Sequence, residues 1–429
     1  MSGMNMIAED DIKALNAWLA KAGLRGEPEA ALVNGFCERA VAASLPISRA
    51  LLLIDTLHPV YEGRVVRWGQ DPSEPAVQEY GRTGSPGAAS DPRLSSPLRF
   101  AHRQVTSEPG WTDARWRASP FFRLLETGES LLRRRVTAET ESEFPVLRDF
   151  RAAGMTEYVA IINRFAPEGV IGEMDCVYSS WVTAQPEGFA DADVAALTRV
   201  VPTLALAFKA AALVRMTGTL MQTYLGRDAG QRVLSGKIVR GITERIDAVV
   251  WFSDLRGFTR ITDTAPEQVI PLLNDYADAI VSAIHENGGD VLKLIGDGTL
   301  AIFTAEDRAH ACSSALSAAI AAQEEIAELN RRRAAAGKPV TEMYLGLHVG
   351  EVFYGNVGSR ERLDFTVVGP AVNEASRIAA MCRSVDQPVL TSSAFAEVDG
   401  MRRRLVSVGR YALRGVAHPQ ELFTLDPDA

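Results

Sequence analysis

Two aspartates in the C-terminal half of this 429-residue chain lie where the sequence predicts chain reversals. Asp254 follows the apolar run 248–252, which predicts a strand, and Asp297 lies between two glycines and two further apolar runs, as at a β-hairpin tip. Carboxylates that converge at a sheet edge suit two Mg²⁺ ions, because Mg²⁺ prefers oxygen ligands and bridging phosphates. Each aspartate alone is equally typical of an ordinary turn, so the prediction depends on the pair.

A polar pair lies further along the chain. The segment 364–378 reads as a strand that passes through Gly369 into a helix, and on that helix Asn373 and Arg377 are four residues apart. This spacing places both side chains on one face, where an amide and a guanidinium can neutralise charge on a phosphate during its reaction. The alternative interpretation is an exposed polar face without a catalytic role.

The elements between these residues must bring the two aspartates together. The sequence predicts strand 248–252, a helix whose apolar face is formed by Val269, Leu273, Tyr276, Ile280 and Ile284, hairpin 291–303, helix 307–333 and strand 343–349. Thr264 and Glu267 have the spacing of a capping box for the first helix. This order places the strand-end aspartate and the hairpin aspartate on neighbouring strands of one sheet.

These segments resemble a known family, the class III nucleotidyl cyclase catalytic domain. The resemblance is carried by residues 252–259, 292–298 and 367–377, continues into 411–416 as the family's final strand, and covers about 243–425. It implies an α+β fold with a ferredoxin-like βαββαβ core. Residues 224–241 also resemble the connector that precedes such domains in sensor-linked bacterial cyclases.

The resemblance implies roles for matching residues. Asp254, Asp297 and the backbone carbonyl of Leu255 match the ligands of two Mg²⁺ or Mn²⁺ ions per active site. The matching residues of the phosphate-binding turn are Gly257, Phe258 and Thr259.

Further matches concern the nucleotide. Asn373 and Arg377 match the pair that orients the ribose and stabilises the transition state. Lys293 and Thr366 match the purine-reading positions, where lysine favours adenine; many animal enzymes have aspartate at the position of Thr366. Arg414 stands where the family often has a triphosphate-binding lysine.

The predicted function is therefore an adenylate cyclase that converts ATP to 3′,5′-cyclic AMP and pyrophosphate. Because the family's sites form across a head-to-tail dimer, the resemblance implies a homodimer with shared active sites. Two alternatives stay open: a guanylate or dual-specificity cyclase, and a catalytically inactive cyclase-like regulatory module. The diguanylate cyclase signature is a weaker option, because Val291-Leu292 follow Gly288-Gly289-Asp290 where that signature requires Glu-Phe.

The N-terminal half predicts a second α+β domain. Strands are expected at 50–55, 158–162 and 174–181, a long helix at 191–224, and a loop at 80–97. Residues 181–189 with the long helix resemble the closing elements of a GAF-type sensor domain, which implies dimerisation or a small-molecule ligand. Trp111, Trp116 and Trp181 are candidates for lining a pocket; the alternative is an unrelated α+β domain with a dimerising exit helix.

The expected domains are a regulatory domain at 1–215, a helical connector at 216–242 and the catalytic domain at 243–429. The net charge of −9 does not favour binding to nucleic acid or to anionic membranes. Four scattered cysteines and a start without a signal peptide predict a cytoplasmic protein. The apolar run 200–214 is too short to span a bilayer and is expected to be a buried amphipathic helix.

Overall fold

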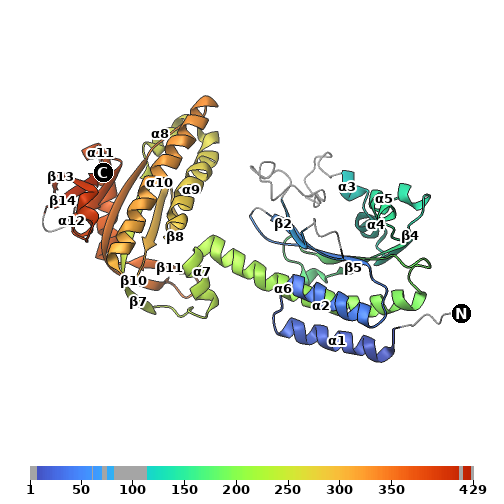
Figure 1. Ribbon diagram of the computed structural model, residues 1–429. Coiled ribbons are helices and arrows are strands. Elements are labelled where there is room, and N and C mark those ends of the chain that lie inside the picture. Colours follow the sequence, from blue (N-terminus) through green and yellow to red (C-terminus); the bar gives the residue numbers. More distant parts are fainter. Residues whose placement is uncertain (1–6, 60, 70–74, 82–113, 415–418, 427–429) are drawn as a thin grey trace. The chain divides into compact units, whose positions relative to one another are not determined.

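The fold is given by a computed structural model, which describes residues 7–59, 61–69, 75–81, 114–414 and 419–426. The chain divides into two units, Met1–Leu220 and Met221–Ala429 (Figure 1).

The N-terminal unit is built on one six-stranded antiparallel sheet with the order β3-β2-β1-β6-β5-β4. The strands predicted at 50–55, 158–162 and 174–181 are confirmed as β1, β5 and β6, and the long predicted helix is α6. The elements are α1 (Glu9–Leu24), α2 (Glu29–Ala42), β1 (Arg49–Asp55), β2 (Tyr61–Trp68), β3 (Val77–Gly81), α3 (Ala114–Arg117), α4 (Pro120–Thr127), β4 (Leu131–Arg135), α5 (Pro145–Ala152), β5 (Glu157–Arg164), β6 (Cys176–Thr183) and α6 (Asp191–Leu225).

Helices cover both faces of this sheet (Figure 1). Helices α1, α2 and α6 pack on one face, and α3, α4 and α5 pack on the other. Trp181 belongs to the first core, whereas Trp116 packs on Tyr178 in the second, with ring centroids 5.7 Å apart. These two tryptophans therefore do not line a common pocket, because alternate residues of β6 point to opposite faces. Trp111 and nearly all of the loop predicted at 80–97 lie outside the described residues.

Helix α6 buries only one side within its unit. Its buried residues include Val200, Leu204 and Phe208, whereas Leu206 and Val214 are 68% and 72% exposed. The helix predicted at 200–214 is therefore confirmed and is buried on one side, but it is not amphipathic, because apolar residues such as Leu206 and Val214 also lie on its exposed side. Among the described helices, α6 alone has the length and apolar composition to cross a membrane, which core helices of water-soluble proteins also have.

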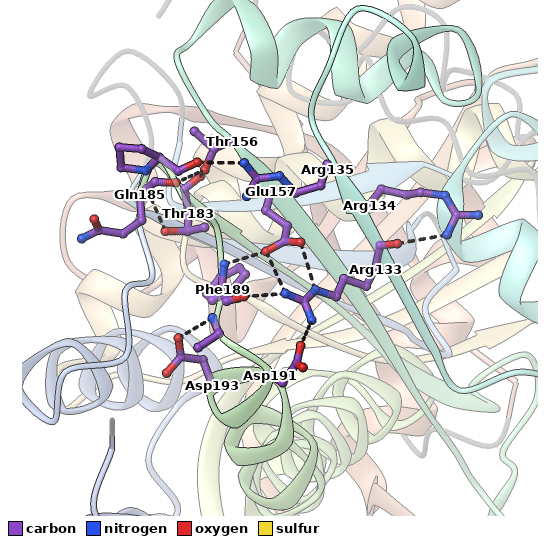
Figure 2. Close-up of polar contacts among 12 residues, drawn as sticks. Arg133, Arg134, Arg135, Thr156, Glu157, Thr183, Gln185, Phe189, Asp191 and Asp193 are labelled. Carbon is purple, nitrogen blue, oxygen red and sulfur yellow. Dashed lines mark hydrogen bonds and ion pairs between the residues drawn. The ribbon is translucent and has the colours of Figure 1, made fainter. Parts of the chain in front are cut away.

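A network of ion pairs fixes the start of α6 (Figure 2). The Glu157 side chain on β5, which is 3% exposed, accepts hydrogen bonds from Arg133 Nε at 2.9 Å and from the Phe189 N–H at 2.6 Å. Arg133, on β4, also donates to the Phe189 carbonyl and to Asp191 at 2.6 Å. Gly188 has a left-handed φ of +81°, and a Cβ there would lie 2.4 Å from a Glu157 carboxylate oxygen. The network therefore needs glycine at 188 and joins two strands to the first turn of α6.

The C-terminal unit has an eight-stranded sheet with the order β13-β14-β12-β10-β7-β9-β8, and β11 also pairs with β10. Its elements are α7 (Arg227–Leu234), β7 (Thr243–Leu255), α8 (Phe258–Thr264), α9 (Val269–Glu286), β8 (Asp290–Ile295), β9 (Gly298–Phe303), α10 (Arg308–Ala335), β10 (Met343–Gly358), β11 (Leu363–Val368), α11 (Pro370–Val385), β12 (Val389–Ser392), α12 (Ser393–Ala396), β13 (Leu405–Tyr411) and β14 (Gln420–Leu425).

The predicted ferredoxin-like core is confirmed in this unit. The succession β7-α9-β8-β9-α10-β10 is a βαββαβ motif, and its strands lie in the order β10-β7-β9-β8. Helices α9 and α10 pack against one face of the sheet, while α7, α11 and β11 contribute to the core on the other face (Figure 1). The catalytic-site candidates lie on β7, on the β8–β9 hairpin, on β11 and on α11.

Two local predictions were wrong. Thr264 does not cap the helix at 269: it ends α8, and its hydroxyl donates to the Arg260 carbonyl at 2.8 Å, as Ser and Thr side chains do inside helices. Residues 412–414 do not continue a final strand, because β13 ends at Tyr411; Arg414 is exposed in the following turn. Residues 415 and 416 lie outside the described residues.

Candidate active site

The fold brings Asp254 and Asp297 together, as the sequence predicts. Asp254 lies near the end of β7, which pairs with β9, and Asp297 lies in the turn that leads into β9. The Leu255 N–H donates to Oδ2 of Asp297 at 3.2 Å, so the turn of one hairpin is tied to the end of the neighbouring strand. Three predicted metal-site residues therefore meet where β7 ends beside the turn that leads into β9.

The electrostatics of this pair fit a cation. Burial, and next the charge of Asp297, raise the pKa of Asp254. Oδ1 of Asp254 is buried and has no hydrogen-bond partner among the described residues. A buried, unpaired carboxylate oxygen beside a second carboxylate is costly unless positive charge compensates it. The described residues bring no third His, Cys, Asp or Glu side chain to form a complete metal cluster.

The turn after Asp254 is held by residues that the sequence reasoning missed. Thr341 Oγ1 donates to the Arg256 carbonyl at 2.6 Å, and the Arg256 N–H donates to the Glu342 carbonyl at 2.8 Å. Gly257 follows with a left-handed φ of +67°, which glycine adopts without steric cost.

The predicted phosphate-binding residues begin the next helix. Phe258 and Thr259 form the first turn of α8, where backbone N–H groups have no partner within the helix. Phe258 packs partly against the core, and Thr259 is exposed. These two backbone amides are therefore the groups through which this turn can meet a phosphate.

A β-bulge sets the direction of Lys293. The register of β8 on β9 shifts between Val291 and Lys293, so that Lys293 lies opposite Leu300. Directly opposed residues point to the same sheet face, and the Leu300 side chain packs in the core cluster that also contains Phe365 of β11. The bulge therefore turns Lys293 toward the face on which β11 packs, as bulges near active sites often do.

Lys293 and Thr366 line one surface groove. Thr366 is buried on β11, where it alternates with the core residues Phe365 and Val367. The Lys293 ammonium forms an ion pair with the Asp364 carboxylate, which lies two residues before Thr366 on the same face of β11. The groove is lined by Lys293, Val357, Gly358, Ser359, Arg362, Asp364, Thr366 and Val368. Asp364 is the second feature that the sequence reasoning missed, although strand alternation from Thr366 would have identified it.

Asn373 does not lie beside the aspartates within one chain. Helix α11 packs its Ala371 side chain against Gly350 of β10. Near the other end of the helix, Cys382 Sγ donates to the Leu345 carbonyl, and the neighbouring residue Tyr344 pairs with Asp254 of β7. At about 1.5 Å per residue, Asn373 and Cys382 are about 14 Å apart along the helix axis. Arg377 lies one turn nearer to the aspartates. The described residues provide no side-chain hydrogen bond or ion pair to Asn373 or Arg377, so both are available to bind a ligand.

A buried polar cluster lies beneath α11. His348 Nδ1 lies 2.9 Å from the Ser392 hydroxyl and 3.7 Å from the Glu374 carboxylate, which also accepts from Gln420 at 3.0 Å. Burial lowers the pKa of His348, while Glu374 acts in the opposite direction and the Arg308 charge reinforces the lowering. The cluster joins α11 to β10, β12 and β14 beside Asn373.

The C-terminal unit is similar to one family of known proteins. Residues 243–426 match the family described as the adenylate and guanylate cyclase catalytic domain. This is the family that the sequence motifs resemble, and the match covers the βαββαβ core and the candidate site residues up to α11.

Two curated relatives named adenylate cyclase and one solved adenylyl cyclase structure are similar to parts of this chain. "Adenylate cyclase 1" of Rhizobium meliloti (strain 1021) is 32% identical over 153 residues, which are 35% of this chain and 23% of the relative. "Adenylate cyclase" of Anabaena cylindrica is 37% identical over 139 residues, which are 31% of this chain and 27% of the relative. The crystal structure of the adenylyl cyclase CyaB from P. aeruginosa matches at 26% identity with a TM-score of 0.40, and covers 43% of this chain and 96% of that one. The matched segment thus spans only about a quarter of those two curated relatives.

Proposed function

We propose that this chain is an adenylate cyclase, which converts ATP to 3′,5′-cyclic AMP and pyrophosphate. The observation that carries the proposal is the meeting of Asp254 and Asp297, where a buried carboxylate oxygen without a hydrogen-bond partner lies beside a second carboxylate. The relatives named adenylate cyclase support the same reaction.

The two aspartates and the Leu255 carbonyl would hold two Mg²⁺ or Mn²⁺ ions. Such ions, when bound, supply charge stabilisation and lower the pKa of the attacking ribose hydroxyl. The backbone amides of Phe258 and Thr259 at the start of α8 are placed to receive phosphate oxygens. Arg414, exposed after β13, supplies a further positive charge for the triphosphate.

Lys293 supports the choice of ATP. Its ammonium can donate to the acceptor N1 of adenine, whereas guanine presents a donor N–H at that position. Thr366 can accept from the adenine amine, but a hydroxyl both donates and accepts, so it discriminates weakly. The guanylate or dual-specificity alternative has one observation in its favour: the Asp364 carboxylate lines the same groove and could accept from guanine.

The active site is proposed to form between two chains. Asn373 lies near the opposite end of α11 from the aspartate pair, so one chain holds two separated half-sites. A head-to-tail homodimer would place Asn373 and Arg377 of one chain over the aspartates of the other. Arg377 would then stabilise charge on the reacting phosphate, and Asn373 would orient the ribose.

The N-terminal unit is proposed to regulate this domain, with α6 and the segment up to residue 242 as the connection. The GAF-like character of this unit and its binding of a small molecule stay predictions. The cytoplasmic location of the protein also stays a prediction. Deletion of residues 1–240 should change the rate of cyclisation or its response to ligands; unchanged activity and regulation would refute the regulatory role.

The first experiment identifies the product. Full-length protein is incubated with ATP or GTP and with Mg²⁺ or Mn²⁺, and cyclic nucleotides are quantified by mass spectrometry. Cyclic AMP that disappears in Asp297→Ala would support the proposed reaction and its metal site. A faster reaction with GTP would favour the guanylate alternative, and no product under any condition, including from residues 243–429, would favour an inactive module.

A mixing experiment tests the shared site. Asp254→Ala and Arg377→Ala should each be nearly inactive, since each removes one half of every site. A mixture of the two should recover part of the activity, because a heterodimer retains one intact site. Lack of recovery, with mixed dimers confirmed by pull-down of differently tagged chains, would refute the shared-site arrangement.

A further inference from the structure

Among the residues that the structure describes, Asp364 is the acidic side chain that forms an ion pair with Lys293, the proposed purine-reading lysine. Its carboxylate pairs with the Lys293 ammonium, and both side chains line the groove that also contains Thr366. The lysine side chain is 30% exposed and that of Asp364 is 46% exposed, so water reaches the pair while the groove wall limits its freedom. The remaining charged side chain among the described residues of this groove is that of Arg362, which repels the Lys293 ammonium.

The geometry of the strands explains why the pair forms. The bulge in β8 turns Lys293 toward the face where β11 packs, and strand alternation places Asp364 and Thr366 on the same side of β11. A lysine side chain has four rotatable bonds and otherwise occupies many positions in a solvated groove. The carboxylate selects those positions in which the ammonium stays near the hydroxyl of Thr366.

We propose that Asp364 is a positioning residue for purine recognition: it holds the Lys293 ammonium where it donates to the ring nitrogen N1 of adenine. This inference rests on the proposed function and extends it to the basis of base selectivity. The ammonium has three N–H donors, so one can stay on Asp364 while another reaches the base. The N1–H of guanine cannot accept from the ammonium, and a carboxylate that stays paired with Lys293 is not free to accept from guanine.

Asp364 also supplies a basis for selecting adenine over guanine that Thr366 cannot supply. A hydroxyl accepts from the adenine amine and donates to the guanine carbonyl with equal ease. Selectivity between the two purines must therefore depend on a group with a fixed donor direction. The charged pair of Lys293 and Asp364 is such a group, and without the carboxylate the lysine loses its fixed direction.

The binding of substrate analogues tests the positioning role of Asp364 without requiring turnover. Affinities of full-length protein for α,β-methylene-ATP and α,β-methylene-GTP are measured by calorimetry with Asp364→Ala, Asp364→Asn, Asp364→Glu and the control Glu361→Gln. Glu361 lies exposed on the same β10–β11 hairpin, and no ion pair involves its side chain among the described residues. Melting temperatures show whether each variant is folded.

The expected result is a loss of selectivity. Asp364→Ala and Asp364→Asn should bind the ATP analogue about tenfold more weakly, the usual effect of losing one charge-assisted hydrogen bond, with little change for the GTP analogue. Asp364→Glu should recover most of the affinity, and Glu361→Gln should bind like the wild type. Equal weakening for both analogues in folded variants, or no change in either, would overturn the inference. So would tighter discrimination in Asp364→Ala, since that result would mean that the carboxylate contacts guanine directly.

A second readout separates the inference from the proposed reaction. In the wild type, 1-deaza-ATP, in which N1 is replaced by CH, should be cyclised with a KM about tenfold higher than that of ATP. In Asp364→Ala the two substrates should differ little in KM, with kcat affected much less than KM. A KM difference that persists in the variant would refute the positioning role while leaving the cyclase function intact. A wild-type chain that binds neither analogue and forms no cyclic nucleotide would overturn both.

Discussion

Replacement of Glu157 by glutamine would break the ion-pair network at the start of α6. The carboxylate accepts from Arg133 at 2.9 Å and from the Phe189 N–H at 2.6 Å, and its side chain is only 3% exposed (Figure 2). Glutamine keeps the size of the side chain, but its amide cannot accept with both terminal atoms. Arg133, whose side chain is 31% exposed, then keeps only the exposed Asp191 as its counter-charge, and a buried N–H of glutamine faces the donors at this site. Such a loss typically costs about 3 kcal/mol.

The chain offers a matched control at Arg134, the residue that follows Arg133 on β4. Arg134 and Glu143 form a pair with two hydrogen bonds of 2.8 Å, but their side chains are 36% and 38% exposed. Exposed pairs of this kind contribute no more than about 1 kcal/mol, because water replaces the partner and salt screens the charges. Glu143→Gln therefore removes the same type of contact at a site where burial does not amplify the loss.

Thermal unfolding monitored by tryptophan fluorescence measures the difference. Five of the six tryptophans belong to the N-terminal unit, so the signal reports mainly on that unit. For a unit of this size, about 3 kcal/mol corresponds to a fall in Tm of roughly 6–12 °C, against at most about 4 °C for Glu143→Gln. Gly188→Ala should resemble Glu157→Gln, because its Cβ would collide with the carboxylate. Equal shifts for Glu157→Gln and Glu143→Gln would refute the argument from burial.

Three further changes test the C-terminal unit. Gly346→Ala should lower stability by about 1–3 kcal/mol and reduce the proposed cyclase activity, because its Cβ would lie 2.4 and 2.5 Å from backbone atoms of α11. The control in denaturant titrations is Gly218→Ala on α6 of the N-terminal unit, whose Cβ meets no atom within 4 Å and which should not lower stability. In the folded state the pKa of His348 is lowered from 6.5, so the stability contributed by the neutral imidazole is complete above pH 6.5. As the pH falls below that value, the free energy of unfolding decreases by at most about 1.4 kcal/mol per pH unit, because the unfolded state takes up the proton first. His348→Gln should therefore flatten the pH dependence of Tm, and an unchanged profile would contradict this. Asp275→Asn should cost about 2–3 kcal/mol in urea unfolding, because Arg333, whose side chain is 3% exposed, loses its ion-pair partner; a loss below about 0.5 kcal/mol would show that water compensates the charge.

The local pattern of the sequence was sufficient for most elements that carry the site. Alternating and continuous apolar runs predicted β1, β5, β6 and the βαββαβ succession, because strands and helices bury their apolar faces with distinct periods. Sharp chain reversals at Asp254 and Asp297 were visible from their flanking residues, and their proximity followed from the strand order. The capping box at Thr264 failed because two helices meet there, and local spacing does not show which helix a residue belongs to.

The tertiary structure decided what depends on contacts between distant segments. The ion pair between Lys293 and Asp364 and the support of the Asp254 turn by Thr341 join segments tens of residues apart, and no local pattern specifies them. The β-bulge before Lys293 lies within one hairpin, but it is defined by the strand register and not by residue types. The same holds for Glu157, which in sequence is an ordinary strand glutamate and becomes buried only because Gly188 and Arg133 close around it. Residue types and periodicity determined the elements and the chemistry available to the chain. Packing determined which charges are buried and paired, because desolvation and distance set those energies and both are properties of the folded chain.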